Sequence, residues 1–162
     1  MAKIKLFITD CDGCMTDGGM YYDNLGNEWK KFNARDGMGF EMLRNSGVKT
    51  GIITSETTAL LERRAAKLKI DEFHQGAKNK PEVLLEILNR LGIDKSEVAY
   101  VGDDINDLKM MELAGLTFCP ADAMKQILPK VDVVLTKKGG DGAVREAAEY
   151  VLEHNNSEAK FA

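Results

Sequence analysis

The sequence predicts an α/β protein with a Rossmann-like, three-layer parallel sheet. Three observations support this fold class: short apolar runs typical of buried strands, helical periodicity between them, and regular alternation of the two. We expect strands at 3–9, 48–54, 71–75, 98–102, 115–118 and 131–135, and helices at 37–46, 56–69, 80–91, 105–114, 122–128 and 141–153. Such alternation favours right-handed βαβ crossovers, which cover a parallel sheet on both faces.

The strand at 3–9 comes first and ends in a group of aspartates within "KIKLFITDCDGCMTDG". The segment that follows, residues 18–33, interrupts the alternation. Its sequence "GGMYYDNLGNEWKKFN" has a glycine-bearing loop between two aromatic-containing runs, which predicts a β-hairpin. We expect this hairpin to stand over the ligand edge of the sheet as a flap, where its aromatic side chains could meet a partner.

Among the expected helices, 80–91 has the clearest pattern, because Leu84, Ile87, Leu88 and Leu91 follow the i, i+3, i+4, i+7 rule. We expect one domain over residues 1–154 and a frayed tail at 155–162. A net charge of −4 and a pI near 5.3 argue against nucleic-acid binding. No apolar run reaches the length of a membrane span, and three cysteines without a secretion signal predict a cytoplasmic location.

Cys11 and Cys14 form a C-x-x-C, which leaves two interpretations. It could be a redox or zinc motif, although His74, His154 and Cys119 are at unsuitable spacing for further zinc ligands. The simpler interpretation, which we favour, is two small side chains beside a turn.

Chemically useful side chains follow several of the expected strands. Ligands of such sheets bind beyond the carboxyl ends of the strands, so these residues should meet at one edge. They are Asp10 and Asp12 after the first strand, Thr54, Ser55 and Glu56 after the second, Lys78 and Lys80 before the 80–91 helix, and Asp103, Asp104 and Asp107 in "GDDIND".

This set suits phosphoryl transfer. Hard carboxylate oxygens favour Mg²⁺, which would relieve the repulsion among the aspartates. One carboxylate can attack phosphorus, and a second, two residues away, can give and take a proton. A lysine and a hydroxyl neutralise charge on the transferring oxygens.

The order "DCDG", "IIT", Lys80 and "GDDIND" resembles the four motifs of the haloacid dehalogenase superfamily, over nearly the whole chain. The resemblance implies that Asp10 is the nucleophile, Asp12 the general acid/base, and Thr54 and Lys80 the phosphate-binding residues. It also implies magnesium bound by Asp10, Asp103 and the backbone carbonyl of Asp12, supported by Asp104 and Asp107. Lys78 is the rival to Lys80, and spacing to the following helix favours Lys80.

The insert after the first motif is only a hairpin, and there is no room for a separate cap domain. In this the chain resembles the capless, tetrameric phosphatases of 3-deoxy-ulosonate phosphates, as do "KKFNARDG" at 30–37 and "KKGGDGAVREAAEYVL" at 137–152. The resemblance implies a homotetramer whose neighbouring subunit completes the site. Its substrate would be an eight-carbon octulosonate 8-phosphate or a nine-carbon ketodeoxynononate or sialic acid 9-phosphate.

The choice between eight and nine carbons depends on a few positions. Glu56, with Arg64 and Lys67 downstream, resembles the nine-carbon members, and Asp141 weakens the eight-carbon reading. "ARDG" at 34–37 favours the eight-carbon group instead, and a charged helix face is often merely solvated. We expect Glu56, Arg63 and Lys67 to share one helix face. We expect Glu56 to meet sugar hydroxyls in its own site and Arg64 or Lys67 to meet the substrate carboxylate in a neighbour's. On balance we expect a nine-carbon substrate and a role in sialic acid biosynthesis.

Two other classes of protein share part of this pattern. A phospho-receiver domain also places Asp, Thr and Lys around magnesium, but its acidic residues come in a different order. A non-catalytic scaffold on the same fold would lack a nucleophile, whereas Asp10 is in place.

Overall fold

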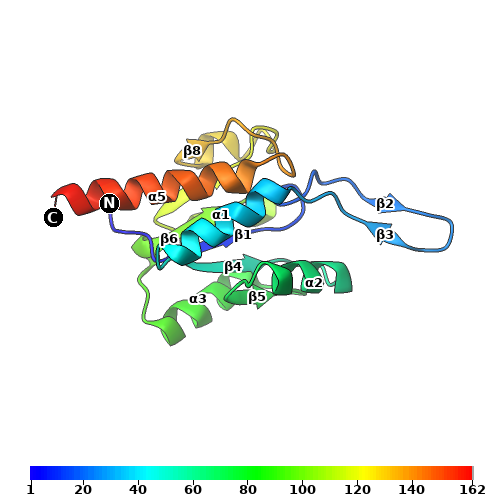
Figure 1. Cartoon of the computed structure of the whole chain (residues 1–162), viewed down its shortest axis with the longest axis horizontal. Helices are drawn as coiled ribbons and strands as arrows, with labels where there is room; N and C mark the ends of the chain where they lie inside the picture. Colours follow the sequence, from blue (N-terminus) through cyan, green and yellow to red (C-terminus); the bar gives the residue numbers. More distant parts are fainter. Residues whose placement is uncertain (162) are drawn as a thin grey trace.

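The computed structural model describes the backbone of residues 1–161 and the side chains of residues 1–156. Its main sheet has six parallel strands in the order β5-β4-β1-β6-β7-β8 (Figure 1). They are β1 (Leu6–Thr9), β4 (Lys49–Ile53), β5 (Glu72–His74), β6 (Val98–Val101), β7 (Leu116–Cys119) and β8 (Val133–Val134). The predicted fold class is confirmed, because all pairs in this sheet are parallel and β1 lies between β4 and β6.

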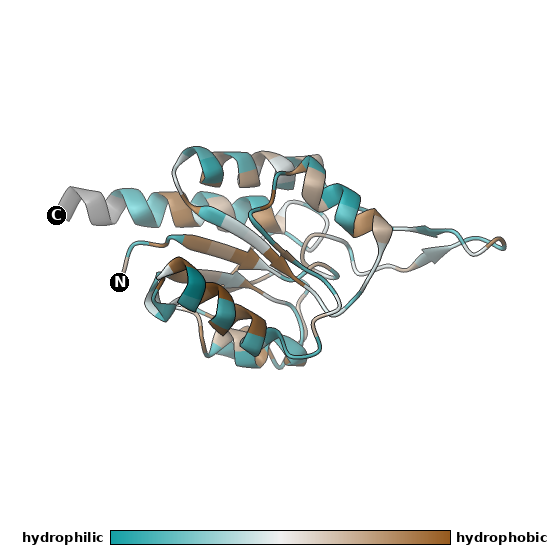
Figure 2. Ribbon diagram, turned by 90° about the horizontal axis from the view of Figure 1, so that it is seen from below, coloured by the Kyte–Doolittle hydropathy of each residue, from teal (hydrophilic) through white to brown (hydrophobic). Residues whose placement is uncertain are grey.

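Helices pack against both faces of the sheet, and each face has its own apolar cluster (Figure 2). Side chains of α1 (Ala34–Asn45), α2 (Ala59–Lys67) and α5 (Ala143–Phe161) enter one cluster, in which Phe7, Phe40 and Phe118 are fully buried. Side chains of α3 (Lys80–Leu91) and α4 (Leu108–Met111) enter the other. Burial of these apolar side chains on both faces is the main force that holds the layers together.

Helix α3 begins and ends where its sequence predicts. The Asn79 side chain caps the helix by accepting from Glu82 N, and Pro81 occupies its first turn. At the other end Gly92 adopts φ 65°, the left-handed conformation that suits a glycine. Leu84, Ile87 and Leu88 are buried as predicted. This firm N-terminus fixes the position of Lys80, which matters for the site below.

Two expected helices differ from the structure. Residues 122–127 form turns and bends, followed by a 3-10 helix at Leu128–Lys130, so the prediction of a helix at 122–128 was wrong. The reason is that this segment bonds to neighbouring loops: Met124 N donates to Asp103 O, and Asp122 accepts from Gly139 N. The expected 105–114 helix is divided into a 3-10 turn, Ile105–Asp107, and α4. A further 3-10 turn, Lys95–Glu97, precedes β6.

The helix expected at 56–69 begins later, at Ala59, because the Thr58 side chain caps it by accepting from Leu61 N. Glu56 therefore lies in the loop before α2, where its carbonyl accepts from Gly76 N. The helix face expected to join Glu56 with Arg63 and Lys67 does not exist. Only Arg63 and Lys67, four residues apart, share a face of α2.

A two-stranded hairpin, β2 (Tyr21–Tyr22) and β3 (Glu28–Trp29), lies where the sequence predicts it. It extends outward from the body, at the end opposite the chain termini (Figure 1). Tyr22 and Trp29 are more than half exposed, and Leu25 at the tip is 88% exposed. A backbone bridge between Thr16 and Phe32 fastens the base of the hairpin to the loop after β1.

The C-terminal helix does not end at the expected domain boundary of 154. Asn155 is buried, and its side-chain amide accepts from Ile4 N and donates to Ile4 O, so it ties α5 to the segment before β1. The rest of the expected tail falls largely on residues 157–162, whose side chains lie outside the described part. Within the described residues, no helix combines the length and apolar character needed to cross a membrane.

Candidate active site

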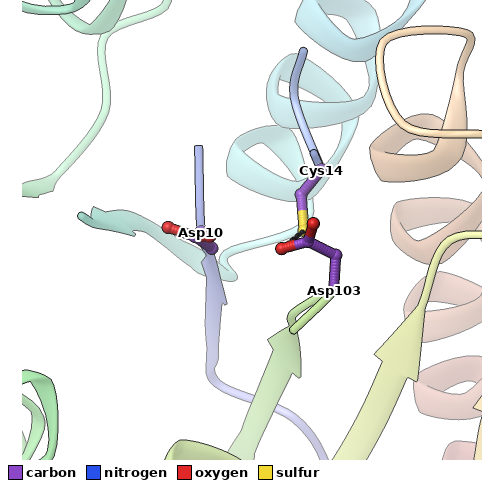
Figure 3. Close-up of side chains that lie close together, drawn as sticks. All are labelled: Asp10, Cys14 and Asp103. Carbon is purple, nitrogen blue, oxygen red and sulfur yellow. Dashed lines mark hydrogen bonds between the residues drawn. The ribbon is translucent and has the colours of Figure 1, made fainter. Parts of the chain in front are cut away.

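Asp10 and Asp103 lie side by side at the carboxyl edge of the sheet, because they follow the adjacent parallel strands β1 and β6 (Figure 3). Asp10 N donates to Val101 O at 3.0 Å, which fixes the end of β1 against β6. Gly13, at φ +83°, packs directly against the Asp103 carboxylate, where a Cβ would overlap it. The loop after β1 therefore needs glycine at this position for two reasons, its backbone conformation and the space that Asp103 occupies.

The side chain of Lys80 extends from the first turn of α3 and contacts two carboxylates, those of Asp10 and Asp107. Its Nζ lies 3.0 Å from Asp10 Oδ1 and 3.1 Å from Asp107 Oδ1, and the lysine is only 5% exposed. Burial alone would lower the pKa of Lys80, but the charges of Asp10 and Asp107 outweigh it and the pKa is raised. The ammonium is therefore held charged beside Asp10, and Lys80 rather than Lys78 is the lysine at the site.

Asp107 is fully buried and organises the loop after β6. Its Oδ1 accepts from the Tyr100 hydroxyl at 2.6 Å as well as from Lys80, and its Oδ2 accepts from Asp103 N at 2.9 Å. Asp104 N also donates to this oxygen, at 3.3 Å. Asp107 thus fixes the backbone that carries Asp103 and Asp104, and at the same time holds Lys80 in place.

Asp12 has partners of its own. Its Oδ1 accepts from Lys30 Nζ at 2.7 Å and is 3.5 Å from Thr16 Oγ1. Lys30 comes from the base of the hairpin, and sequence reasoning missed it. In "WKKFN" two lysines are adjacent, and only the structure distinguishes them: the side chain of Lys30 is 2% exposed, whereas Lys31 is exposed. Period-two alternation along the hairpin strand was the one signal that could have separated them.

The carboxylates at this edge carry more negative charge than Lys80 can balance. Burial, followed by the charge of Asp107, raises the pKa of Asp10 to about 6 despite Lys80. Burial, followed by the charges of Asp10 and Asp107, raises the pKa of Asp103 to about 7. The raised pKa values mean that the charged forms of these two neighbouring carboxyl groups are unfavourable without a counter-ion. A divalent cation bound between them would supply the missing positive charge.

The donor atoms at this position favour magnesium over zinc. Oxygens of Asp10 and Asp103 and the sulfur of Cys14 lie within 4.8 Å of one another (Figure 3). Burial and the charge of Asp103 raise the pKa of the Cys14 thiol well above its usual value, so the sulfur remains a thiol directed at Asp103 Oδ1. A neutral thiol is a poor ligand, which leaves hard oxygens as the donors.

The C-x-x-C does not have the properties of a redox motif. Cys11 and Cys14 are both free and fully buried, and burial raises the pKa of each thiol. A reactive thiol pair would need lowered pKa values and access to solvent. The structure therefore supports the simpler interpretation, in which Cys11 and Cys14 are small side chains packed beside the turn.

A cavity of about 280 Å³ opens over these groups. The end of β4 contributes Thr54, which is 2% exposed and accepts from Glu56 N through its hydroxyl at 3.3 Å. The predicted site residues that line this cavity are Asp10, Asp12, Thr54, Glu56, Lys80, Asp103 and Asp104. Asp107 lies beneath the cavity, where it supports Lys80 and the 103–104 backbone.

Arg64 and Lys67 are not brought to this cavity. They line a separate hollow of about 530 Å³ between α2 and the base of the hairpin, together with Arg63, Lys30 and Phe32. The Arg64 guanidinium lies 5.5 Å from the centre of the Phe32 ring. Within a single chain, these two basic residues are therefore separate from Asp10 and Thr54.

Comparison with known proteins agrees with this geometry. The haloacid dehalogenase-like hydrolase family matches residues 35–115. Among curated proteins, the 3-deoxy-D-manno-octulosonate 8-phosphate phosphatase of Yersinia pestis is 43% identical over 151 residues, which cover 93% of this chain and 81% of the relative. The corresponding protein of Escherichia coli K12 is 42% identical over 150 residues, covering 93% and 80%.

Solved structures of such proteins share the fold. The Yersinia pestis phosphatase superposes with a TM-score of 0.93 at 42% identity, covering 96% of this chain and 84% of that one. A Moraxella catarrhalis 3-deoxy-D-manno-octulosonate 8-phosphate phosphatase, solved in complex with magnesium ion, phosphate ion and KDO molecule, gives a TM-score of 0.91 at 39% identity, covering 98% and 91%. The chain belongs to the haloacid dehalogenase-like hydrolases, among the phosphatases of the 3-deoxy-ulosonate-phosphate family.

Proposed function

We propose that this phosphatase removes the terminal phosphate of 3-deoxy-D-manno-octulosonate 8-phosphate, with magnesium as its cofactor. The observation that carries the proposal is the convergence of Asp10, Lys80 and Asp103 in one cavity, within a chain 42–43% identical to phosphatases with that name. The expectation of a nine-carbon substrate is thereby replaced, as the leading proposal, by the eight-carbon alternative.

In the proposed reaction an Asp10 oxygen attacks phosphorus while the bond from phosphorus to the sugar oxygen breaks. Asp12 gives its proton to that sugar oxygen, so that an alcohol leaves. Water then attacks the phosphorus of the aspartyl-phosphate, Asp12 takes its proton, and the bond to Asp10 breaks. Inorganic phosphate is released, Asp10 is again a free carboxylate, and Asp12 again carries the proton that it gave.

Lys80 and the Thr54 hydroxyl would hold the phosphoryl oxygens during both steps. Both side chains line the cavity and are almost fully buried, so their interactions with a developing negative charge are little weakened by water. Magnesium held by Asp10, Asp103 and the backbone carbonyl of Asp12 would supply further positive charge at the transferring group. Asp104 and Asp107 would support these ligands through the loop that they organise.

A nine-carbon 9-phosphate, of the ketodeoxynononate or sialic acid type, is the second candidate. The observation in its favour is that Glu56 lines the cavity, beyond Thr54, where a carboxylate can accept from sugar hydroxyls. Arg64 and Lys67, which lie elsewhere in the chain, would then meet the substrate carboxylate in the site of a second copy.

If Arg64 and Lys67 of one copy bind the substrate carboxylate in the site of another, the protein must be an oligomer. We propose a homotetramer. It is supported by the exposed Tyr22, Leu25 and Trp29 of the hairpin, an apolar surface that protein contacts commonly cover. Light scattering on the active protein tests it, and a fully active monomer would exclude it. The three free cysteines support the cytoplasmic location that we also propose.

The substrate proposal is tested by magnesium-dependent phosphate release from an eight-carbon 8-phosphate and a nine-carbon 9-phosphate, measured side by side. The Asp10→Asn protein serves as the blank. We expect a higher kcat/KM for the eight-carbon compound. A clear preference for nine carbons would support Glu56 as the selecting residue instead, and no release from either would refute the ulosonate proposal.

A further inference from the structure

We propose that Lys30 is a positioning residue that holds Asp12 in place for proton transfer and thereby couples the hairpin to the chemistry. This inference rests on the phosphatase reaction proposed above. It starts from an ion pair that the four sequence motifs do not include: Lys30 Nζ to Asp12 Oδ1 at 2.7 Å, with the lysine side chain 2% exposed.

The burial of the Lys30 side chain indicates that its ion pair with Asp12 is part of the structure of the site and not a surface contact. Burial costs a lysine free energy that only a well-placed partner offsets. Here the Asp12 carboxylate is such a partner, because its Oδ1 lies in direct hydrogen-bond contact with Lys30 Nζ. The nearest other carboxylate, Glu28 Oε1, is farther away at 3.6 Å. Asp12 is therefore the main charged partner of the buried Lys30 side chain.

The backbone around Lys30 is fixed to the same loop that carries Asp12. The bridge between Thr16 and Phe32 joins the two segments just beyond Lys30. Thr16 Oγ1 in turn lies 3.5 Å from Asp12 Oδ1 and accepts from Gly13 N and Gly18 N. The base of the hairpin, the turn after β1 and the Asp12 side chain therefore form one connected unit.

This unit leaves one Asp12 oxygen for catalysis. Both contacts of the carboxylate, Lys30 and Thr16, are made by Oδ1, so Oδ2 is the oxygen that can carry the proton to or from the substrate. A side chain held at one oxygen keeps the other in a defined position, and the proton transfer depends on that position. Without Lys30, only the longer contact to Thr16 Oγ1 remains to hold the Asp12 side chain in one rotamer.

The test compares two aryl phosphates that differ in their need for a proton and, in structure, only by a para nitro group. Phenyl phosphate has a poor leaving group that requires protonation by Asp12, whereas p-nitrophenolate leaves readily without it. Because kcat/KM reports on the steps up to departure of the leaving group, it isolates proton donation from the later hydrolysis. Neither substrate is a sugar, so the result does not depend on whether the natural substrate has eight or nine carbons.

We expect Lys30→Met to lower kcat/KM for phenyl phosphate by about 10- to 100-fold and for p-nitrophenyl phosphate by less than about threefold, since general acid catalysis contributes about 10²- to 10⁴-fold. Lys30→Arg should restore most of the phenyl phosphate activity. Lys31→Met, in the adjacent exposed lysine, should change neither value. Glu28→Gln tests the hairpin-side contact, with a smaller effect expected in the same direction.

An equal loss on both aryl phosphates would overturn the proposal, because it would show a structural role or a role in phosphate binding. A rise in KM alone, with kcat unchanged, would also overturn it by showing substrate contact. If Lys30→Met does not fold, Lys30→Gln is measured in its place against the same two substrates. If the chain released no phosphate from any compound, the phosphatase reaction itself would be refuted, which is a separate result.

Discussion

The Asp103 carboxylate occupies the space where a side chain on Gly13 would begin. This packing of the turn after β1 against the loop after β6 brings the first and last motifs of the site together. It also defines a matched pair of substitutions, because Gly26 in the hairpin has almost the same φ, 81° against 83°, but nothing within 4 Å of a Cβ.

Gly13→Ala should displace Asp103 and weaken magnesium binding. We expect magnesium affinity and kcat/KM to fall at least about tenfold, and the free energy of unfolding to fall by about 1–3 kcal/mol from strain at positive φ. Gly26→Ala carries the same backbone cost without the overlap, and should leave affinity and activity unchanged. Calorimetric titration with magnesium and chemical denaturation measure both effects. Equal activity in the two variants would show that Asp103 tolerates the overlap.

Asp107→Asn should impair catalysis even though Asp107 does not line the cavity. The change removes the charge that holds Lys80 and weakens the support of the 103–104 backbone. We expect kcat for p-nitrophenyl phosphate to fall about 10- to 100-fold. Tyr100→Phe removes only one donor to Asp107, and its kcat should stay within about threefold of wild type, at a cost of about 1 kcal/mol in stability. Wild-type kcat in the Asp107→Asn protein would refute the role assigned to this carboxylate.

Asp36 should make folding less favourable as the pH rises. It is 2% exposed, accepts from Arg145 N through Oδ1, and has no partner for Oδ2 among the described residues. Burial raises the pKa of Asp36 from 3.8 to about 6. Because the folded protein binds this proton more tightly than the unfolded chain, stability is lost as the pH rises from about 4 to 6 and is constant above that window.

The Asp36→Asn variant tests this dependence. A shift of about two pKa units corresponds to about 3 kcal/mol, so the variant should gain about that much relative to wild type between pH 4 and pH 7. The difference between the two proteins cancels the contributions of other groups. Denaturant unfolding at several pH values measures it. A difference that does not change with pH would show that Asp36 titrates normally.

Lys67→Ala tests the proposed contact across a subunit boundary. Lys67 is exposed and lines the hollow beside α2 rather than the catalytic cavity. If it binds the substrate carboxylate from a neighbouring subunit, KM should rise about tenfold for the ulosonate phosphate but stay constant for p-nitrophenyl phosphate, which has no carboxylate. Lys125→Ala, another exposed lysine, is the charge-matched control. The same change in KM for both substrates would remove Lys67 from the substrate site.

Much of the fold and the catalytic cavity could be predicted from the sequence. Alternating strands and helices fix which residues reach the carboxyl edge, and this placed Asp10, Thr54, Lys80 and Asp103 together. Spacing to the following helix also favoured Lys80 over Lys78, and in the structure that helix, α3, begins at Lys80. These features are local or follow from the topology, so pattern and spacing suffice to find them.

What the sequence did not predict depends on long-range contacts. The side chain of Lys30 is buried by its pairing with Asp12, eighteen residues away, and it was not identified as a site residue from the sequence. Residues 122–128 have a helical pattern, but bonds to Asp103 and Gly139 hold them in turns. Glu56 was expected on a helix because several polar residues in "TSETT" are of a type that can cap a helix. In the structure Thr58 is the N-cap, so the helix begins after Glu56.

In the proposed mechanism Asp10 becomes phosphorylated during turnover, and this intermediate can be trapped and detected. The protein is mixed with magnesium and p-nitrophenyl phosphate, quenched in acid within the first turnover, and analysed by peptide mass spectrometry. We predict one added phosphoryl group on the peptide that contains Asp10, absent without magnesium and absent in Asp10→Asn. A phosphoryl group on another residue, or phosphate release at the wild-type rate by Asp10→Asn, would exclude Asp10 as the nucleophile.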